Sequence, residues 1–216
     1  MITAFQAPLW IELLAAGLGG LQGAIFAAAE RRRRIDVLGV VVIGLAVALG
    51  GSLLRDSLLD QPPVVIWSNA YLLVAGASAI LGMLVQPLLA RGEWAITALD
   101  AVSMGLFGAI GASKALALGA GPAGALVVGI VGAIGGGMLR DVILSLPFSF
   151  LQVGTLYAVA AGAGVATLLL LIGVGTPVPV AGVVCVIVTA ALRVAAVRFD
   201  WRFPEQGPLR RRVTPR

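Results

Sequence analysis

The sequence predicts an all-α membrane protein with seven transmembrane helices, arranged as an inverted repeat of two three-helix units plus a seventh helix. Two observations carry this prediction. The 216 residues are 60% hydrophobic and 12% charged, with a mean hydropathy of +1.05, and soluble domains of this length do not have such a composition. The chain also matches itself without a gap from about Gly20 to Pro62 when it is shifted by 85 residues.

The seven predicted helices are apolar segments of roughly the length, about 20 residues, that a membrane requires. They are residues 8–28, 37–58, 65–88, 96–116, 122–144, 151–172 and 178–197. The first is expected to be a retained helix rather than a signal peptide, because no positive charge precedes it and four arginines follow it.

The internal match brings residues 50–56, Gly-Gly-Ser-Leu-Leu-Arg-Asp, onto residues 135–141, Gly-Gly-Gly-Met-Leu-Arg-Asp. Each copy holds three helices, and an odd number makes the second copy enter the membrane from the opposite side. We therefore expect four parts: a first repeat at 8–90, an inverted second repeat at 95–173, the seventh helix at 178–199 and a basic tail at 200–216.

Arginines predict the orientation. They cluster at 31–34, between the first two helices, and at 210–212 in the tail, whereas the connections at 60–63, 119–121 and 173–177 carry neither arginine nor lysine. Positive loops stay in the cytoplasm. The N-terminus is expected outside and the C-terminus in the cytoplasm. The net charge of +5 is attributed to this topology signal and not to nucleic-acid binding.

The chain resembles prokaryotic members of the trimeric intracellular cation channels (TRIC), which are also described in bacteria as glycine transporters. The matching features are both glycine-rich motifs, Asp100-Ala101, the stretch 111–115 (Gly-Ala-Ser-Lys-Ala) and the duplicated three-helix unit, over about Trp10 to Phe199. The resemblance implies a homotrimer in which each protomer has its own cation pore, bounded by glycine-broken second and fifth helices. The basic lipid-binding signature of animal members is not evident.

Consecutive glycines in both copies favour breaks near the membrane midplane, although single glycines in membrane helices usually serve close packing. A broken helix would expose carbonyl oxygens, which can partly replace the water of a cation. Ser52 stands where the second motif has its third glycine, so we expect the first break to be less pronounced. The predicted pore and gate residues are these glycines, this serine and two residues of the fourth helix: Gly50, Gly51, Ser52, Gly135, Gly136, Gly137, Ser113 and Lys114.

Charged and polar residues near the ends of these helices have two interpretations. They can snorkel to the surface and pair with each other, or they can line the pore mouths. Asp100 can draw cations to the inner mouth or can simply be a charge at a helix start. The residues concerned are Arg55, Asp56, Arg140, Asp141, Asp100 and Ser103.

Lys114 is the only lysine of the chain and has no acidic neighbour in sequence. Its ammonium can snorkel to the outer surface, or it can stand where a permeant cation would stand and so guard the pore. We favour the second interpretation as the sharper hypothesis.

These residues predict a monovalent cation channel, passing potassium and also sodium, in the inner membrane of a prokaryote. The alternative is a secondary transporter of glycine or a similar small solute, because inverted repeats and broken helices suit transporters as well. An enzyme is not expected, since the chain has no histidine and no nucleophile–base pair within sequence reach. We expect no cofactor and no tight metal site, only transient permeant potassium or sodium ions. The expected partners are membrane lipids and further copies of the chain.

Overall fold

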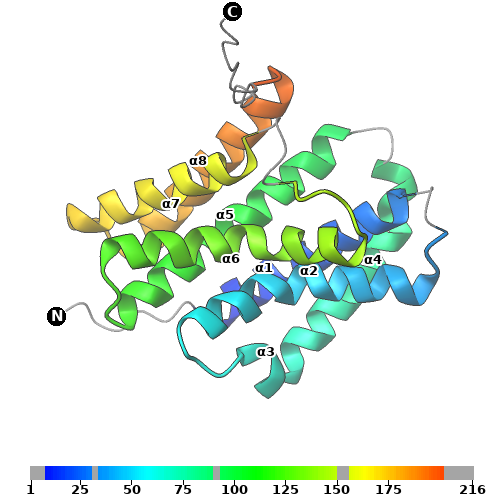
Figure 1. Cartoon of the computed structure of the whole chain (residues 1–216), viewed down its shortest axis with the longest axis horizontal. Helices are drawn as coiled ribbons and strands as arrows, with labels where there is room; N and C mark the ends of the chain where they lie inside the picture. The colour runs from blue at the N-terminus through cyan, green and yellow to red at the C-terminus, as the bar shows by residue number, and fades with distance from the viewer. Residues whose placement is uncertain (1–7, 31–33, 90–92, 150–155, 202–216) are drawn as a thin grey trace, which may run out of the picture.

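The computed structural model describes residues 8–30, 34–89, 93–149 and 156–201. Within these ranges the chain forms eight helices and no strand (Figure 1). They are α1 (Leu9–Ala29), α2 (Val37–Leu58), α3 (Val64–Trp67), α4 (Asn69–Leu89), α5 (Glu93–Ala117), α6 (Pro122–Ile143), α7 (Tyr157–Gly173) and α8 (Val178–Arg198).

Six of the helices in the described ranges are long and apolar enough to cross a membrane: α1, α2, α4, α5, α6 and α8. The sixth predicted segment corresponds to α7, an apolar helix of 17 residues. Its predicted start at residue 151 lies outside the described residues, as do the arginines at 31–33 and most of the basic tail. The all-helical membrane class is thus confirmed, whereas seven full-length spans are not.

The third predicted segment is interrupted, which is a correction to the single helix expected at 65–88. α3 ends at Trp67, Ser68 has an extended backbone (φ −128°, ψ 110°), and α4 starts at Asn69. The carbonyl of Ser68 then accepts a hydrogen bond from the Tyr71 amide at 3.2 Å. A serine–asparagine pair is a common helix start, and here that local signal overrides the apolar run.

α2 and α6 have the same length, and both bounds of α6 lie 85 residues after those of α2. Each helix ends in the same way. Asp60 (φ 51°) and Ser145 (φ 45°) adopt the left-handed conformation just past the helix ends, a turn that closes helices by local hydrogen bonds. The repeat seen in the sequence is therefore also a repeat of backbone conformation.

The two repeats meet along α2 and α6, which pack against each other and run in opposite directions (Figure 1). On one side α1 packs against α2 and α4, and on the other α5 packs against α6 and α8. An antiparallel α2–α6 pair is what an inverted repeat produces. α8 departs from the repeat, because it shares with α7 the flank of α5.

Candidate functional site

The glycine motifs lie where α2 and α6 cross, and the expectation of helix breaks there is wrong. Both helices continue through their glycines. A Cβ atom on Gly51 would collide with the carbonyl oxygen of Gly132, and one on Gly136 would collide with that of Val47. A Cβ on Gly135 would lie 3.1 Å from the Cα of Gly51. The glycines therefore serve close backbone approach, which is what small residues do in membrane helices, and they do not free carbonyl groups.

The remaining motif positions, Gly50, Gly137 and Ser52, also fit closely packed, continuous helices. Gly50 also faces α6. A Cβ on Gly137 would lie 3.0 Å from the hydroxyl of Tyr157, so this glycine makes room for the tyrosine. Its counterpart Ser52 is buried and donates a hydrogen bond of 2.7 Å to the carbonyl of Leu49, three residues back in α2. The serine therefore fits within a continuous helix.

The Arg-Asp pair of the first motif is buried near the end of α2, with 2% of Arg55 and none of Asp56 exposed. Arg55 Nε donates to Asp56 Oδ1 at 2.7 Å, and the Val64 amide donates to Asp56 Oδ2 at 3.3 Å. The carboxylate thus ties the end of α2 to the start of α3. Burial favours mutual pairing over snorkelling for this motif.

The second motif repeats this arrangement 85 residues later. Arg140 Nη2 donates to Asp141 Oδ1 at 2.7 Å, and the Ser149 amide donates to Asp141 Oδ2 at 2.8 Å. The Arg140 guanidinium also lies 3.9 Å from the ring centroid of Phe26, a cation–π contact between the two repeats. Each pair therefore fixes the segment that follows its helix.

Lys114 is not an unpaired charge, which corrects the simplest view of a lone intramembrane lysine. Its Nζ donates to Asp56 Oδ1 at 2.8 Å, and 22% of its side chain is exposed. The residue 85 positions earlier is Ala29, so the second motif has no matching lysine. This ion pair links α5 to α2 and is the main asymmetry between the two motifs.

A small polar cavity lies beside the first motif. We call it the Glu12 cavity; its volume is about 10 Å³, and its lining includes Glu12, Ser52, Arg55, Tyr71 and Phe107. The Tyr71 hydroxyl makes a short hydrogen bond to the Glu12 carboxylate, and Arg55 Nη2 is buried without a hydrogen-bond partner. A space of this size holds about one water molecule. A buried unpartnered guanidinium nitrogen calls for such a water.

A second polar cavity, the Asp100 cavity, also has a volume of about 10 Å³, and its lining includes Gln22, Asp100, Ser103, Phe107 and Tyr157. The Tyr157 hydroxyl donates to Asp100 Oδ1 at 3.3 Å. Ser103 Oγ is buried and has no hydrogen-bond partner. The cavity thus combines a carboxylate, a tyrosine and a hydroxyl that requires water.

The two cavities are related by the repeat. Three pairs of lining residues stand 85 positions apart, one member in each cavity: Ala48 and Ala133, Ser52 and Gly137, and Gln22 and Phe107. Tyr71 lies shortly after α3 in the first repeat, and Tyr157 is the first residue of α7 in the second. The sequence repeat therefore supplies equivalent positions to both cavities, each of which is lined by residues of both repeats, whereas the carboxylates of Glu12 and Asp100 are not at equivalent positions.

Sequence reasoning missed four of these polar residues: Glu12, Gln22, Tyr71 and Tyr157. The Tyr71–Glu12 and Tyr157–Asp100 contacts join residues 59 and 57 positions apart. A usable signal existed, because an acidic or amide side chain inside an apolar helix is expensive and marks a functional candidate. Arg193 of α8 was also missed; its Nε lies 4.0 Å from Asp100 Oδ2.

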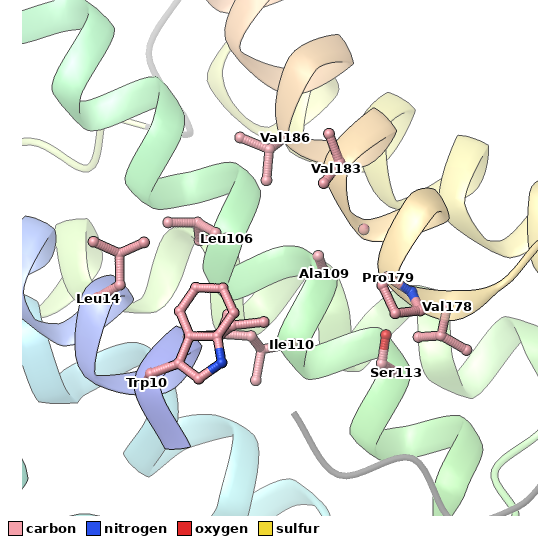
Figure 2. A pocket seen from close by; sticks show the side chains of 12 residues that line it. Trp10, Leu14, Leu106, Ala109, Ile110, Ser113, Val178, Pro179, Val183 and Val186 are labelled. Atoms are coloured by element: carbon pink, nitrogen blue, oxygen red, sulfur yellow. The ribbon is translucent and has the colours of Figure 1, made fainter. Parts of the chain in front are cut away.

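A third, apolar cavity lies elsewhere. It has a volume of about 340 Å³ between α1, α5 and α8, and Trp10, Ile110, Val178 and Ser113 are among its lining residues (Figure 2). Ser113 therefore faces this groove and neither polar cavity. Among the described residues, no charged side chain lines this groove and Ser113 supplies its one hydroxyl, so it offers an ion little in place of water.

Comparison with known proteins gives consistent matches. The sequence model of the family described as "Glycine transporter" matches residues 9–87 and 97–173. A membrane protein of Deinococcus radiodurans is 35% identical over 156 residues, covering 71% of each chain. The inner membrane protein YadS of Escherichia coli K12 is 30% identical over 199 residues, covering 90% of this chain and 94% of YadS.

Solved structures share the fold. A structure described for conductance through TRIC cation channels superposes with a TM-score of 0.80 at 26% identity, covering 91% of this chain and 96% of that one. The TRIC orthologue from Rhodobacter sphaeroides superposes with the same TM-score at 27% identity, covering 88% and 97% of the two chains.

Proposed function

This chain belongs to the TRIC family, whose sequence model is described as glycine transporter, and on that premise we propose that it is a monovalent cation channel. The proposed permeant ions are potassium and sodium, and the proposed pore runs through each protomer of a homotrimer. The solved structures that it resembles are described as cation channels.

The observation that carries the proposal is the pair of polar cavities. Each has a carboxylate in its lining, Glu12 in one and Asp100 in the other. Residues of α1, α2, α4 and α5 line the Glu12 cavity, and residues of α1, α2, α5, α6 and α7 line the Asp100 cavity. Carboxylates and polar groups inside a membrane are costly and mark ion or substrate pathways. Lining carboxylates also favour cations over anions.

In this proposal Lys114 guards one end of the pathway. Its ammonium occupies Asp56 Oδ1, which is an oxygen that a cation could otherwise approach. The lysine side chain is partly exposed while Asp56 is fully buried, so the lysine can leave without moving the acid. Arg55 and the Val64 amide would continue to hold Asp56.

The glycine transporter alternative is less consistent with the cavities. Each has room for about one water molecule, whereas glycine has five non-hydrogen atoms. A dehydrated monovalent cation is comparable in size to a water molecule. We therefore favour ion conduction, and the experiment below includes an arm for glycine.

Purified protein in planar bilayers tests the proposal. Parent channels are expected to give unitary potassium and sodium currents, and Glu12→Gln and Asp100→Asn are expected to lower the single-channel conductance. Glu30→Gln is the matched control, because Glu30 follows α1 and lines neither cavity. Saturable uptake of labelled glycine without unitary currents would favour the transporter instead. Absence of both activities would contradict both.

A further inference from the structure

Among the residues that the structure describes, Phe107 alone lines both polar cavities. It lies in the middle part of α5, and 8% of its surface is exposed. Polar groups stand on both sides of it, Glu12 and Ser52 on one and Asp100 and Ser103 on the other. The phenyl ring is therefore an apolar wall shared by two cavities whose linings combine polar and apolar side chains.

Three glycines of neighbouring helices lie close to Phe107. A Cβ atom on Gly19 would lie 3.3 Å from Phe107 Cε2, and one on Gly51 would lie 3.7 Å from Cδ1. A Cβ on Gly132 would lie 3.3 Å from the Phe107 carbonyl oxygen. Glycines of α1, α2 and α6 thus surround the phenylalanine, and they leave the ring as the bulky group at this crossing.

The repeat gives this position a polar counterpart. The residue 85 positions before Phe107 is Gln22, which is buried in α1 and lines the Asp100 cavity. Two nearly symmetric halves therefore place an amide at one of the two equivalent positions and a phenyl ring at the other. The apolar wall is a feature of the second repeat alone and does not follow from helix packing common to both.

An ion cannot cross such a wall at low cost. A phenyl ring offers no oxygen to replace the hydration shell, and apolar constrictions in channels close by excluding water. We propose that the Phe107 ring is the central barrier of the pathway, closed in this structure, and that displacement of the ring joins the two cavities. This inference rests on the proposed cation pathway and adds a gate distinct from Lys114.

Cysteine reporters on the two sides of the ring test the barrier. Ser52→Cys reports on the Glu12 cavity and Ser103→Cys on the Asp100 cavity, each with the buried Cys185 replaced by alanine. The probe is silver ion, a monovalent cation that thiolates bind, applied to one face of reconstituted vesicles at a time. With Phe107 in place, the two reporters are expected to react from opposite faces. With Phe107→Ala, each is expected to react from both.

Two further variants keep the result interpretable. Phe107→Gln introduces the residue of the equivalent position and replaces Phe107→Ala if the alanine variant fails to fold. Leu168→Ala truncates a fully buried side chain of α7 that lines neither cavity, and it is expected to leave the sidedness unchanged. Reporters that react from both faces with Phe107 in place would overturn the barrier. So would sidedness that survives the Phe107 change, or reporters that react from neither face throughout.

The outcomes separate this inference from the proposed function. Parent protein that conducts cations, combined with sidedness that does not depend on Phe107, would reject the barrier and leave the channel. In the converse case, the reporters lose their sidedness in Phe107→Ala but the parent protein carries no cation current. This result would support the Phe107 barrier in a pathway for silver ion and would reject the proposed channel function.

Discussion

Asp56 gathers partners from three segments of the chain, the Arg55 guanidinium, the Val64 amide and the Lys114 ammonium. A buried carboxylate needs such compensation, because an isolated charge in a low-dielectric interior is costly. Two of the three partners belong to the first repeat and recur in the second as Arg140 and Ser149. Lys114 is the additional one, so it is the partner that the local structure can lose.

Replacing Lys114 by methionine is expected to raise the open probability, because the ammonium no longer covers Asp56. The variant is also expected to lose stability, since a hydrogen bond to a charged group contributes about 1.5–3 kcal/mol. Asp56 keeps its bonds to Arg55 and to the Val64 amide in this variant. The loss of stability should therefore stay below the value for a buried charge that loses its only partner, which is about 3–5 kcal/mol. Single-channel recording and the thermal midpoint in detergent measure the two effects.

Arg198→Met is the matched control, because it removes a positive charge from an exposed site at the end of α8. It is expected to alter neither gating nor stability measurably. Lys114→Glu brings a carboxylate toward Asp56 and is expected to be less stable than Lys114→Met. An unchanged open probability in both Lys114 variants would assign the lysine to structural pairing alone.

The sequence could single out Lys114 as unusual but could not identify its partner. The two residues are 58 positions apart, and no local pattern connects them. The same holds for the tyrosine–carboxylate contacts of the two cavities. Intramembrane polar residues were visible in the sequence, whereas the grouping of these residues into two chambers depends on how α1 and α5 pack against the glycine helices.

At the scale of the helices, the sequence could predict that the glycines of α2 and α6 matter, but it could not predict what they do. Consecutive glycines at equivalent places predicted a special role for these segments, and the structure does bring them together. The predicted break and the observed close crossing both require glycine. The choice between them depends on the neighbouring backbone, because a carbonyl oxygen stands where a Cβ on Gly51 or Gly136 would lie, and one sequence does not reveal that neighbour.

Gly136→Ala is therefore expected to destabilise the protein. Its Cβ would meet the Val47 carbonyl oxygen, which is backbone and cannot rotate away, and overpacking typically costs about 1–3 kcal/mol. Gly51→Ala is expected to have a similar effect, since its Cβ would meet the Gly132 carbonyl oxygen. Thermal unfolding in detergent measures both changes.

Gly124→Ala provides the control within the same helix. Its Cβ would lie 3.7 Å from the Cβ of Ala120, which is an ordinary contact, and alanine favours the helix by about 1 kcal/mol over glycine. It is expected to be neutral or stabilising. Equal stability of Gly124→Ala and Gly136→Ala would mean that the crossing tolerates wider spacing than the structure indicates.

For the whole molecule, the repeat was the most informative part of the sequence. Its spacing of 85 residues reappears in the bounds of α2 and α6, in their left-handed end residues and in the linings of the two cavities. The positions of α8 and of the break at Ser68 could not be predicted in this way, because α8 lies outside the repeat and the spacing of the repeat does not indicate an interruption within a segment. Tertiary packing around α5 decides the first, and a local start signal decides the second.

The arginine distribution leads to a topology prediction for the whole molecule. Cysteine at Gln61 and at Gly121 is expected to react with an impermeant thiol reagent from outside, because their connections lack positive charge. Cysteine at Arg34 is expected to react only from the cytoplasmic side. The natural Cys185 is buried and should stay silent. Reaction of Gln61 and Arg34 variants from the same side would reject this topology.

The location of the cavities also predicts how a trimer would conduct. Residues of α1, α2 and α5 line both polar cavities, with Tyr71 of α4 added in one and residues of α6 and α7 in the other, so each protomer should carry an independent pore. Mass measurement in detergent is expected to give three protomers.

Trimers that mix parent and Lys114→Met protomers, purified through two different tags, should then show two gating behaviours side by side, each with the open probability of its own homotrimer. The two homotrimers are the reference recordings. A single uniform gating mode of intermediate open probability would instead require one pore shared by the three chains, and the cavities within each protomer would then have another role.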